Sequence, residues 1–169
     1  NAVDTVIIEN STIYNITARI FRDDGGQNNY MKLNQNTVVN SGMRILEFGE
    51  IIEGIVTNNI FVNCGYLAQD SSSGHGLFDM DSIGDGSTQS ITISNNCFYT
   101  SSEVENAWPD ADTVVPVGRY DETSQAFADA KGLDGTNIEL QPDFTNPPPD
   151  PIQGIQAFWD ANTERKLLG

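Results

Sequence analysis

Four segments of the chain repeat one pattern, and this repeat constrains the fold more than any other feature. They read IENSTIYNI from residue 8, LNQNTVVNS from residue 33, VTNNIFVNC from residue 56 and ISNNCFYTS from residue 93, with spacings of 25, 23 and 37 residues. Each segment holds short runs of β-branched and aromatic residues around polar turn residues. A period of this length with short strands indicates repeats that stack on one another.

Two columns of the aligned repeats are apolar, and the second of them is predicted to line the core. The first column is Ile8, Leu33, Val56 and Ile93, and the sixth is Ile13, Val38, Phe61 and Phe98. The apolar runs are too short for amphipathic helices and carry no helical period. They match short strands bounded by Asn, Gly and Ser.

The fourth column is polar and reads Ser11, Asn36, Asn59 and Asn96. Asn tolerates the left-handed backbone of a tight corner, and identical Asn side chains in adjacent repeats can bond to one another. We therefore expect the three asparagines to form a buried ladder, with Ser11 in their place at one end. Asn10-Ser11-Thr12 and Asn15-Ile16-Thr17 also match the N-glycosylation acceptor pattern, although stacking explains these asparagines without sugar.

The pattern predicts an all-β fold, a right-handed parallel β-helix of about four coils. Three short strands per coil of about 23 residues would place successive coils about 4.8 Å apart. Over residues 3–101 the repeats resemble the pectate-lyase-like superfamily of right-handed β-helices. Residues 140–147, LQPDFTNP, resemble the D-P-x-F-x-N-P phrase that often closes secreted bacterial β-helix domains, with Gln141 in place of the leading Asp. This resemblance implies an extracellular or cell-surface protein and the C-terminal portion of a longer one.

The chain is predicted to divide into two parts. Residues 1–102 would form the coils, and a Gly-, Ser- and Asp-rich insertion at 69–89 would account for the long third spacing. Residues 103–169 would form a C-terminal segment that covers the coils. Short helices are expected there at 122–131 and after Pro151.

Charge excludes some partners. The 169 residues carry a formal net charge of −16, which argues against nucleic acid and against anionic lipid surfaces. It disfavours polyanionic substrates unless a cation bridges them, and it suits an extracellular setting. No run of apolar residues is long enough to span a membrane. The two cysteines, Cys64 and Cys97, fall in different columns, so we expect free thiols rather than a disulfide.

Catalytic candidates are few. The tripeptide Gly74-His75-Gly76 resembles one signature of the polygalacturonase family, but the Asn-Thr-Asp strand of that family is absent from the sequence, and the Asp-Asp pair that the sequence does contain, Asp23-Asp24, ends 51 residues before His75 rather than on a neighbouring coil. The repeat alignment also places Arg19 over Arg44. A lyase of this fold needs a Lys or Arg base, a cation against the substrate carboxylate and a second positive group, and Arg19, Arg44 and the loop of Asp79–Asp85 could supply these parts. Alternatively, the two arginines belong to a charged surface ladder, and His75 is a surface histidine.

The insertion also holds a candidate metal site. Asp79, Asp81 and Asp85 alternate with turn residues, an arrangement that suits a hard cation such as calcium. The run is not an EF-hand loop, because the fifth position lacks a ligand and no Glu stands at the twelfth. The alternative is a solvated acidic turn.

Function is less constrained than fold. The leading hypothesis is an extracellular β-helix module that contacts carbohydrate and is non-catalytic as it stands, with polysaccharide as partner. One alternative is a polysaccharide lyase or glycoside hydrolase whose catalytic coils lie upstream. Another is a fibre or surface-layer subunit that stacks through open coil ends. In each case we expect the N-terminal coil end to be covered by upstream coils, by the C-terminal helix or by a neighbouring subunit.

Overall fold

In a computed structural model, residues 4–16, 19–42, 45–65, 78–80, 90–107 and 136–145 are described. Apart from one short helix, α1 (Ser102–Ala107), the regular structure of these residues is β. One parallel sheet contains β1 (Thr5–Glu9), β3 (Phe21–Asn34), β5 (Leu46–Thr57), β7 (Phe78–Met80) and β8 (Ser90–Ser94). The other contains β2 (Thr12–Ile16), β4 (Thr37–Ser41), β6 (Ile60–Cys64), β9 (Cys97–Tyr99) and β10 (Ile138–Glu139).

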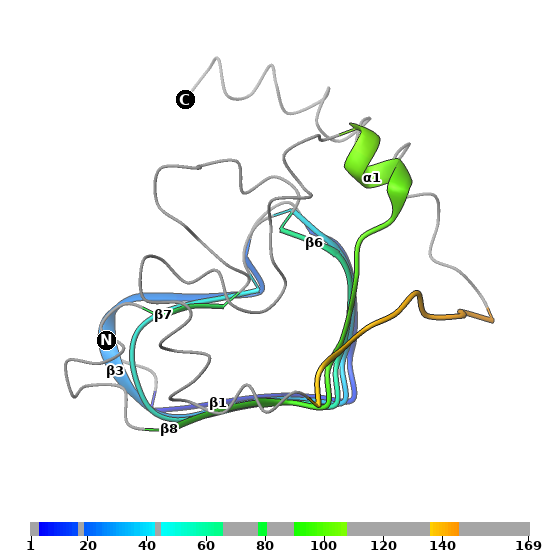
Figure 1. Cartoon of the computed structure of the whole chain (residues 1–169). Coiled ribbons are helices and arrows are strands. Elements are labelled where there is room, and N and C mark those ends of the chain that lie inside the picture. The colour runs from blue at the N-terminus through cyan, green and yellow to red at the C-terminus, as the bar shows by residue number, and fades with distance from the viewer. Residues whose placement is uncertain are drawn as a thin grey trace, which may run out of the picture.

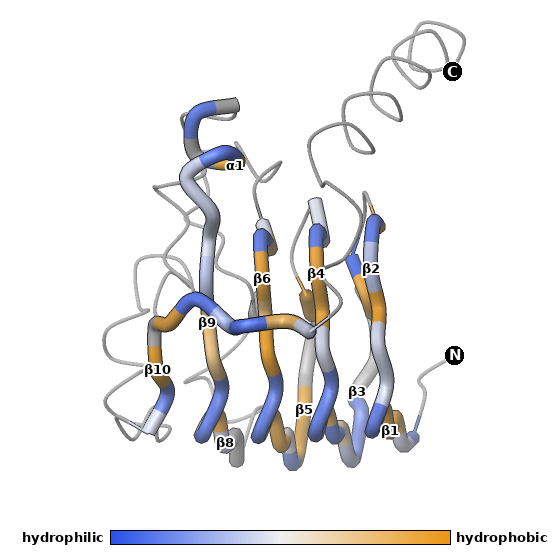
Figure 2. The backbone as a smooth tube through the Cα atoms, turned by 90° about the vertical axis from the view of Figure 1, so that its right-hand side faces the viewer, coloured by the Kyte–Doolittle hydropathy of each residue, from blue (hydrophilic) through white to orange (hydrophobic). Residues whose placement is uncertain are grey.

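The chain alternates between the two sheets, so that each repeat lies beside the next. We call each repeat a rung. The first rung contains β1 and β2, the second the end of β3 with β4, the third the end of β5 with β6, and the fourth β8 and β9. Viewed along the stack, the strands of successive rungs superpose (Figure 1). Viewed from the side, β2, β4, β6, β9 and β10 lie next to one another (Figure 2).

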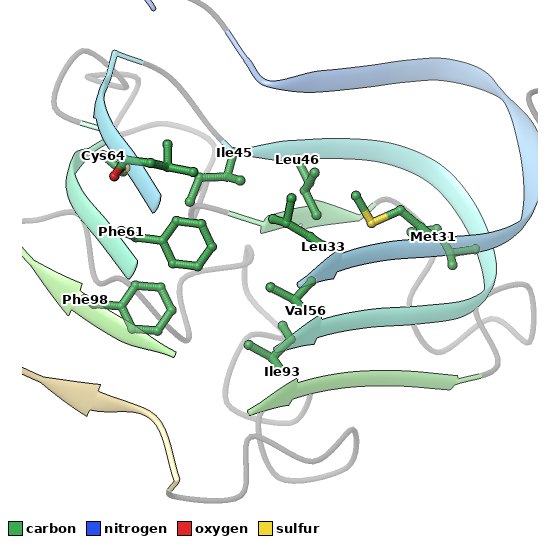
Figure 3. Packing of buried hydrophobic residues seen from close by; sticks show 11 residues of the cluster. Met31, Leu33, Ile45, Leu46, Val56, Phe61, Cys64, Ile93 and Phe98 are labelled. Atoms are coloured by element: carbon green, nitrogen blue, oxygen red, sulfur yellow. The ribbon is translucent and has the colours of Figure 1, made fainter. Parts of the chain in front are cut away.

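The predicted apolar columns are confirmed. Strand pairing aligns Ile8 with Leu33, Leu33 with Val56 and Val56 with Ile93. In the other sheet it aligns Ile13 with Val38, Val38 with Phe61 and Phe61 with Phe98. From the second rung onward these side chains are at most 3% exposed and fill the space between the sheets (Figure 3). The rings of Phe61 and Phe98 stack, with centroids 5.2 Å apart.

The strands β3 and β5 are longer than the repeat pattern predicts. Each continues from the end of one rung into the start of the next, so two predicted strands are joined through a bend (Figure 1). The pairing register shifts at this bend, between Asp23 and Gln27 on β3. Here β3 holds Asp24, Gly25 and Gly26 opposite the single residue Gly49. This bulge contains the extra residues that make the first spacing longer than the second.

The strand β7 lies inside the predicted insertion. It pairs with Leu46–Phe48 of β5, whereas β8 pairs with Glu53–Thr57 of the same strand. The extra residues of the fourth rung therefore fall into two parts, one between Cys64 and Phe78 and the other between Met80 and Ser90. Part of the sequence expected to protrude instead continues the sheet.

The predicted asparagine ladder is present and buried. Asn36, Asn59 and Asn96 are each about 1% exposed or less. The Oδ1 atom of Asn59 accepts bonds from the backbone N of Asn36 at 2.9 Å and from its Nδ2 at 3.0 Å. The Oδ1 atom of Asn96 accepts the same two bonds from Asn59. Each Nδ2 also donates to a backbone carbonyl of the preceding rung, such as that of Leu33 for Asn59. Ser11 begins the ladder by donating its backbone N–H to Asn36.

A second ladder stands at the other end of the same strands. Asn40 Nδ2 donates to Asn15 Oδ1 at 2.8 Å, and Asn63 Nδ2 donates to Asn40 Oδ1 at 3.2 Å. These three residues have φ angles of 55°, 58° and 52°, in the left-handed region that Asn tolerates. The fourth rung has Thr100 instead. There the chain enters α1, where Ser101 Oγ accepts a bond from the N–H of Val104.

β10 extends the ladder beyond the four predicted rungs. Asn137 Oδ1 accepts from the N and Nδ2 atoms of Asn96 at 3.0 and 2.9 Å, and Asn137 Nδ2 donates to the carbonyl of Ile93. Ile138 pairs with Cys97. The sequence alignment missed this rung because Glu139 stands where the other rungs have an apolar core residue.

The segment after β10 crosses the outer face of the sheet that contains β9 and β6 (Figures 1 and 2). Along it, Pro142 and Phe144 are half-buried, whereas Gln141, Asp143 and Thr145 are exposed. This alternation places Pro142 and Phe144 on the opposite side of the segment from Gln141, Asp143 and Thr145. On the sheet that contains β4 and β6, the outward-pointing Val39 and Val62 are only 3% and 6% exposed.

Candidate functional site

The outer face of the sheet formed by β1, β3, β5 and β8 carries the polar side chains with the most binding chemistry. In β3, Met31 and Leu33 are fully buried, so the alternating side chains of Tyr30, Lys32 and Asn34 point outward. Their neighbours are set by parallel register, which places Ile7 and Glu9 on β1 and Glu53, Ile55 and Thr57 on β5 beside them. We call these eight residues the polar face.

An ion pair lies at the centre of the polar face. Lys32 Nζ lies 2.5 Å from Glu9 Oε1, with the two side chains 31% and 32% exposed. The hydrogen bond to Lys32 lowers the pKa of Glu9, and the same bond raises the pKa of Lys32. Lys32 therefore stays protonated at neutral pH, so it can bind an oxygen atom as a cation but cannot act as a general base.

Asn34 joins this pair to the next rung. Its Nδ2 lies 3.4 Å from Glu9 Oε1, and its Oδ1 accepts bonds from Thr57 Oγ1 at 3.0 Å and from Asn58 Nδ2 at 2.9 Å. These contacts fix hydrogen-bond donors and acceptors on three neighbouring strands, β1, β3 and β5. The half-buried Tyr30 adds an aromatic ring to the same face, and the exposed Ile7 adds an apolar edge.

Such a surface can bind a ligand that has both hydroxyl groups and apolar C–H faces. Tyrosine combines a flat ring with a polar tip, and the Lys32–Glu9 pair offers a donor and an acceptor close together.

The residues singled out from the sequence lie mostly elsewhere. Arg19 is half-buried in the segment that connects β2 with β3, and it is not one of the residues of the polar face. Arg44, His75, Asp81 and Asp85 lie outside the described residues, so the proposed arginine pair and the calcium site remain predictions. Of Asp79 only the backbone is placed, in β7 opposite Glu47. Strand pairing aligns Phe21 with Leu46 and Arg22 with Glu47, in the same register that the repeat alignment gives.

Sequence reasoning did not select the polar face. The signal was available: residues one position before and after the apolar first column must point outward in a strand. Applied to the repeats, this rule gives Ile7, Lys32, Ile55 and Thr92 in one column and Glu9, Asn34, Thr57 and Ser94 in the next. Strand pairing confirms both columns.

The two cysteines are free thiols with little nucleophilic character. Cys64 is buried in the core, and desolvation raises its pKa to about 12. Burial also raises the pKa of Cys97, whose Sγ lies 3.2 Å from the carbonyl of Leu140. Because the thiolate is the reactive form, neither sulfur is activated.

Among the described residues, no cluster of three or more His, Cys, Asp or Glu side chains could hold a metal ion. Within the same residues, no helix has the length and hydropathy needed to cross a bilayer. Comparison of the sequence and structure with protein-family models, with curated proteins and with solved structures gives no match.

Proposed function

We propose that the chain is a right-handed parallel β-helix of the pectate-lyase-like kind, and that it acts outside the cell as a carbohydrate-contacting module without catalytic activity of its own. Parallel strands that alternate between two sheets, with a buried asparagine ladder at one corner, support the β-helix. The secreted location is supported by the acidic composition and the resemblance of the repeats.

The polar face carries the functional proposal. It presents Tyr30 beside the Lys32–Glu9 pair and Asn34, on rigid neighbouring strands rather than on loops. Strands about 4.8 Å apart place these groups at a spacing comparable to the size of one sugar ring. The net charge of −16 disfavours polyanionic glycans, so the proposed ligand is a neutral polysaccharide.

Affinity electrophoresis tests this proposal. The protein is run through gels that contain a neutral β-glucan, xylan, pectate or alginate, with and without calcium. We expect retardation by at least one neutral polymer and a several-fold weaker effect for Tyr30→Ala and Lys32→Gln. The matched control is Thr12→Ala, an exposed position on the other sheet. Equal retardation of all variants, or of none including the unchanged protein, would contradict the proposal.

A second candidate function, stacking between subunits, is favoured by one observation. Among the described strands, β1 and β2 are the edge strands at the same end of the stack. The core positions of this first rung, among them Val6, Ile8 and Ile13, are only partly buried, whereas Leu33 and Val38 in the next rung are fully buried. Light scattering during size-exclusion chromatography distinguishes the functions: stacking requires an oligomer that Ile13→Lys dissociates, and a monomer excludes it.

A further inference from the structure

The acceptor triplet Asn10-Ser11-Thr12 lies at the corner between β1 and β2. Asn10 is exposed and has a φ of 51°, Ser11 is half-buried and Thr12 is exposed. The Ser11 hydroxyl turns back onto its own rung and donates to the carbonyl of Glu9 at 2.9 Å. Both residues that define the triplet, Asn10 and Thr12, therefore present their side chains to solvent.

Neither asparagine ladder includes Asn10. The first ladder begins with Ser11 and the second with Asn15, whose Oδ1 accepts a bond from Asn40 Nδ2. Asn10 contributes its backbone N–H to the carbonyl of Asn34 at 3.2 Å, and within the described residues its side-chain amide makes no hydrogen bond. Stacking thus accounts for Asn15 but not for the side chain of Asn10.

The same corner recurs in later rungs without the acceptor triplet. Gln35, Asn58 and Asn95 have φ angles of 56°, 59° and 56°. The second rung reads Gln35-Asn36-Thr37, which lacks only the asparagine, and the third and fourth rungs have no Ser or Thr two positions later. The corner geometry therefore tolerates Gln. Of these four corners, only the one in the first rung combines an exposed Asn with a Thr two positions later.

We propose that Asn10 is an N-glycosylation site, an inference that rests on the extracellular location in the proposed function. In the reaction, Asn10 Nδ2 forms a bond to the anomeric carbon of an oligosaccharide carried on an isoprenoid pyrophosphate. The bond from that carbon to the phosphate oxygen breaks, the pyrophosphate leaves, and the Nδ2 proton passes to a base of the transferase. The glycan would stand beside β1 and β2, where it would hinder strand pairing with another protein molecule.

The test is to secrete the full chain from a host whose secretory pathway carries out N-glycosylation. Mass spectrometry before and after an N-glycan-releasing enzyme should show one glycan, located on the peptide that contains Asn10. Asn10→Gln and Thr12→Ala should each lose it. Ser11→Ala should keep it, because the middle residue is not part of the pattern. Asn15→Gln should leave the modification of Asn10 unchanged.

A gain of modification tests the corner itself. Gln35→Asn places the complete triplet at the equivalent corner of the second rung, and we expect a second glycan there. Secreted, folded protein without a glycan on Asn10 would overturn the proposal. A Gln35→Asn variant that gains no glycan would contradict the role of the corner. Because polysaccharide binding is measured on unglycosylated protein, failure of the one proposal is distinguishable from failure of the other.

Discussion

Asn59 donates its backbone N–H and an amide N–H of its side group to the Oδ1 atom of Asn96, which lies 37 residues further along the sequence, at 3.0 and 2.9 Å. The same geometry relates Asn36 to Asn59 and Asn96 to Asn137. One asparagine in each rung thereby satisfies buried backbone groups in its neighbours. The ladder fixes the position of one rung on the next independently of the apolar core.

Asn59→Ala should therefore destabilise the fold strongly. It leaves the backbone N–H of Asn36 and one of the two Nδ2 N–H groups of Asn36 without an acceptor, while the other keeps its bond to the Ile8 carbonyl, and each buried unsatisfied group costs about 1–3 kcal/mol. We expect the free energy of unfolding in urea to fall by about 3 kcal/mol or more. Asn58→Gly, at an exposed left-handed position next to it, is the control and should change the free energy by less than about 1 kcal/mol.

Phe61→Ala should lower the free energy of unfolding by about 3–5 kcal/mol, because the change removes buried surface and leaves a cavity. Phe61 is 1% exposed and stacks on Phe98. Phe61→Leu, which keeps most of the volume, should cost about 1.5 kcal/mol or less. Denaturation midpoints of the two variants compared in urea give the measurement, and equal losses would argue against the stacked packing of the two rings.

The Glu9–Lys32 pair should make stability depend on pH in two windows. The pKa of Glu9 lies below its ordinary value of 4.5, so its contribution is present above that value and is lost as the pH falls through the lowered pKa. The pKa of Lys32 lies above its ordinary value of 10.5, so its contribution is lost as the pH rises through the raised pKa.

Melting temperatures of the unchanged protein and of Glu9→Gln should therefore differ between these limits and converge in acid. The difference should also shrink at high salt, since the pair is exposed to solvent. A constant difference from pH 3 to pH 7 would mean that the pair does not form.

Calcium should stabilise the protein if Asp79, Asp81 and Asp85 bind it. A chelator should then lower the melting temperature and added calcium should restore it, because an ion that binds only the folded state stabilises that state. Asp81→Asn should abolish the response. A melting curve that does not move over millimolar calcium would exclude the metal site.

We expect no cleavage of pectate, alginate or chondroitin by this protein. The sequence contains a single histidine, and Lys32, the amine of the polar face, is held protonated by Glu9. The assay is the ultraviolet absorbance of unsaturated products. Their appearance, and their loss in Arg44→Ala, would instead support the lyase alternative.

Much of the fold could be predicted because the repeat carries two signals at once. Alternation along a strand decides which residues face inward, and the position of the asparagines fixes the alignment, so Ile13, Val38, Phe61 and Phe98 were placed in one column correctly. The fifth rung escaped because β10 is short and Glu139 breaks the apolar column. The bulge in β3 could not be predicted, because the sequence does not distinguish two extra residues within a strand from a loop that is two residues longer.

The candidate site was harder to predict for a physical reason. Arg19, Arg44 and His75 were chosen for their chemistry, and chemistry does not determine which residues share a face. Lys32 and Glu9 are ordinary surface residues in sequence, 23 positions apart. They meet only because β1 and β3 pair in parallel with Ile7 opposite Lys32.

The two asparagine ladders have a further consequence, which lies in their directions. In the ladder of Asn36, Asn59, Asn96 and Asn137, each amide oxygen accepts bonds from the rung before it. In the ladder of Asn15, Asn40 and Asn63, the amide oxygens of Asn15 and Asn40 instead accept a bond from the rung after them. The amide dipoles of the two columns therefore point in opposite directions along the stack. In the second and third rungs, which carry an asparagine of each column, the opposed dipoles reduce the electrical polarity along the stack, whereas the fourth rung has Thr100 in place of the second asparagine.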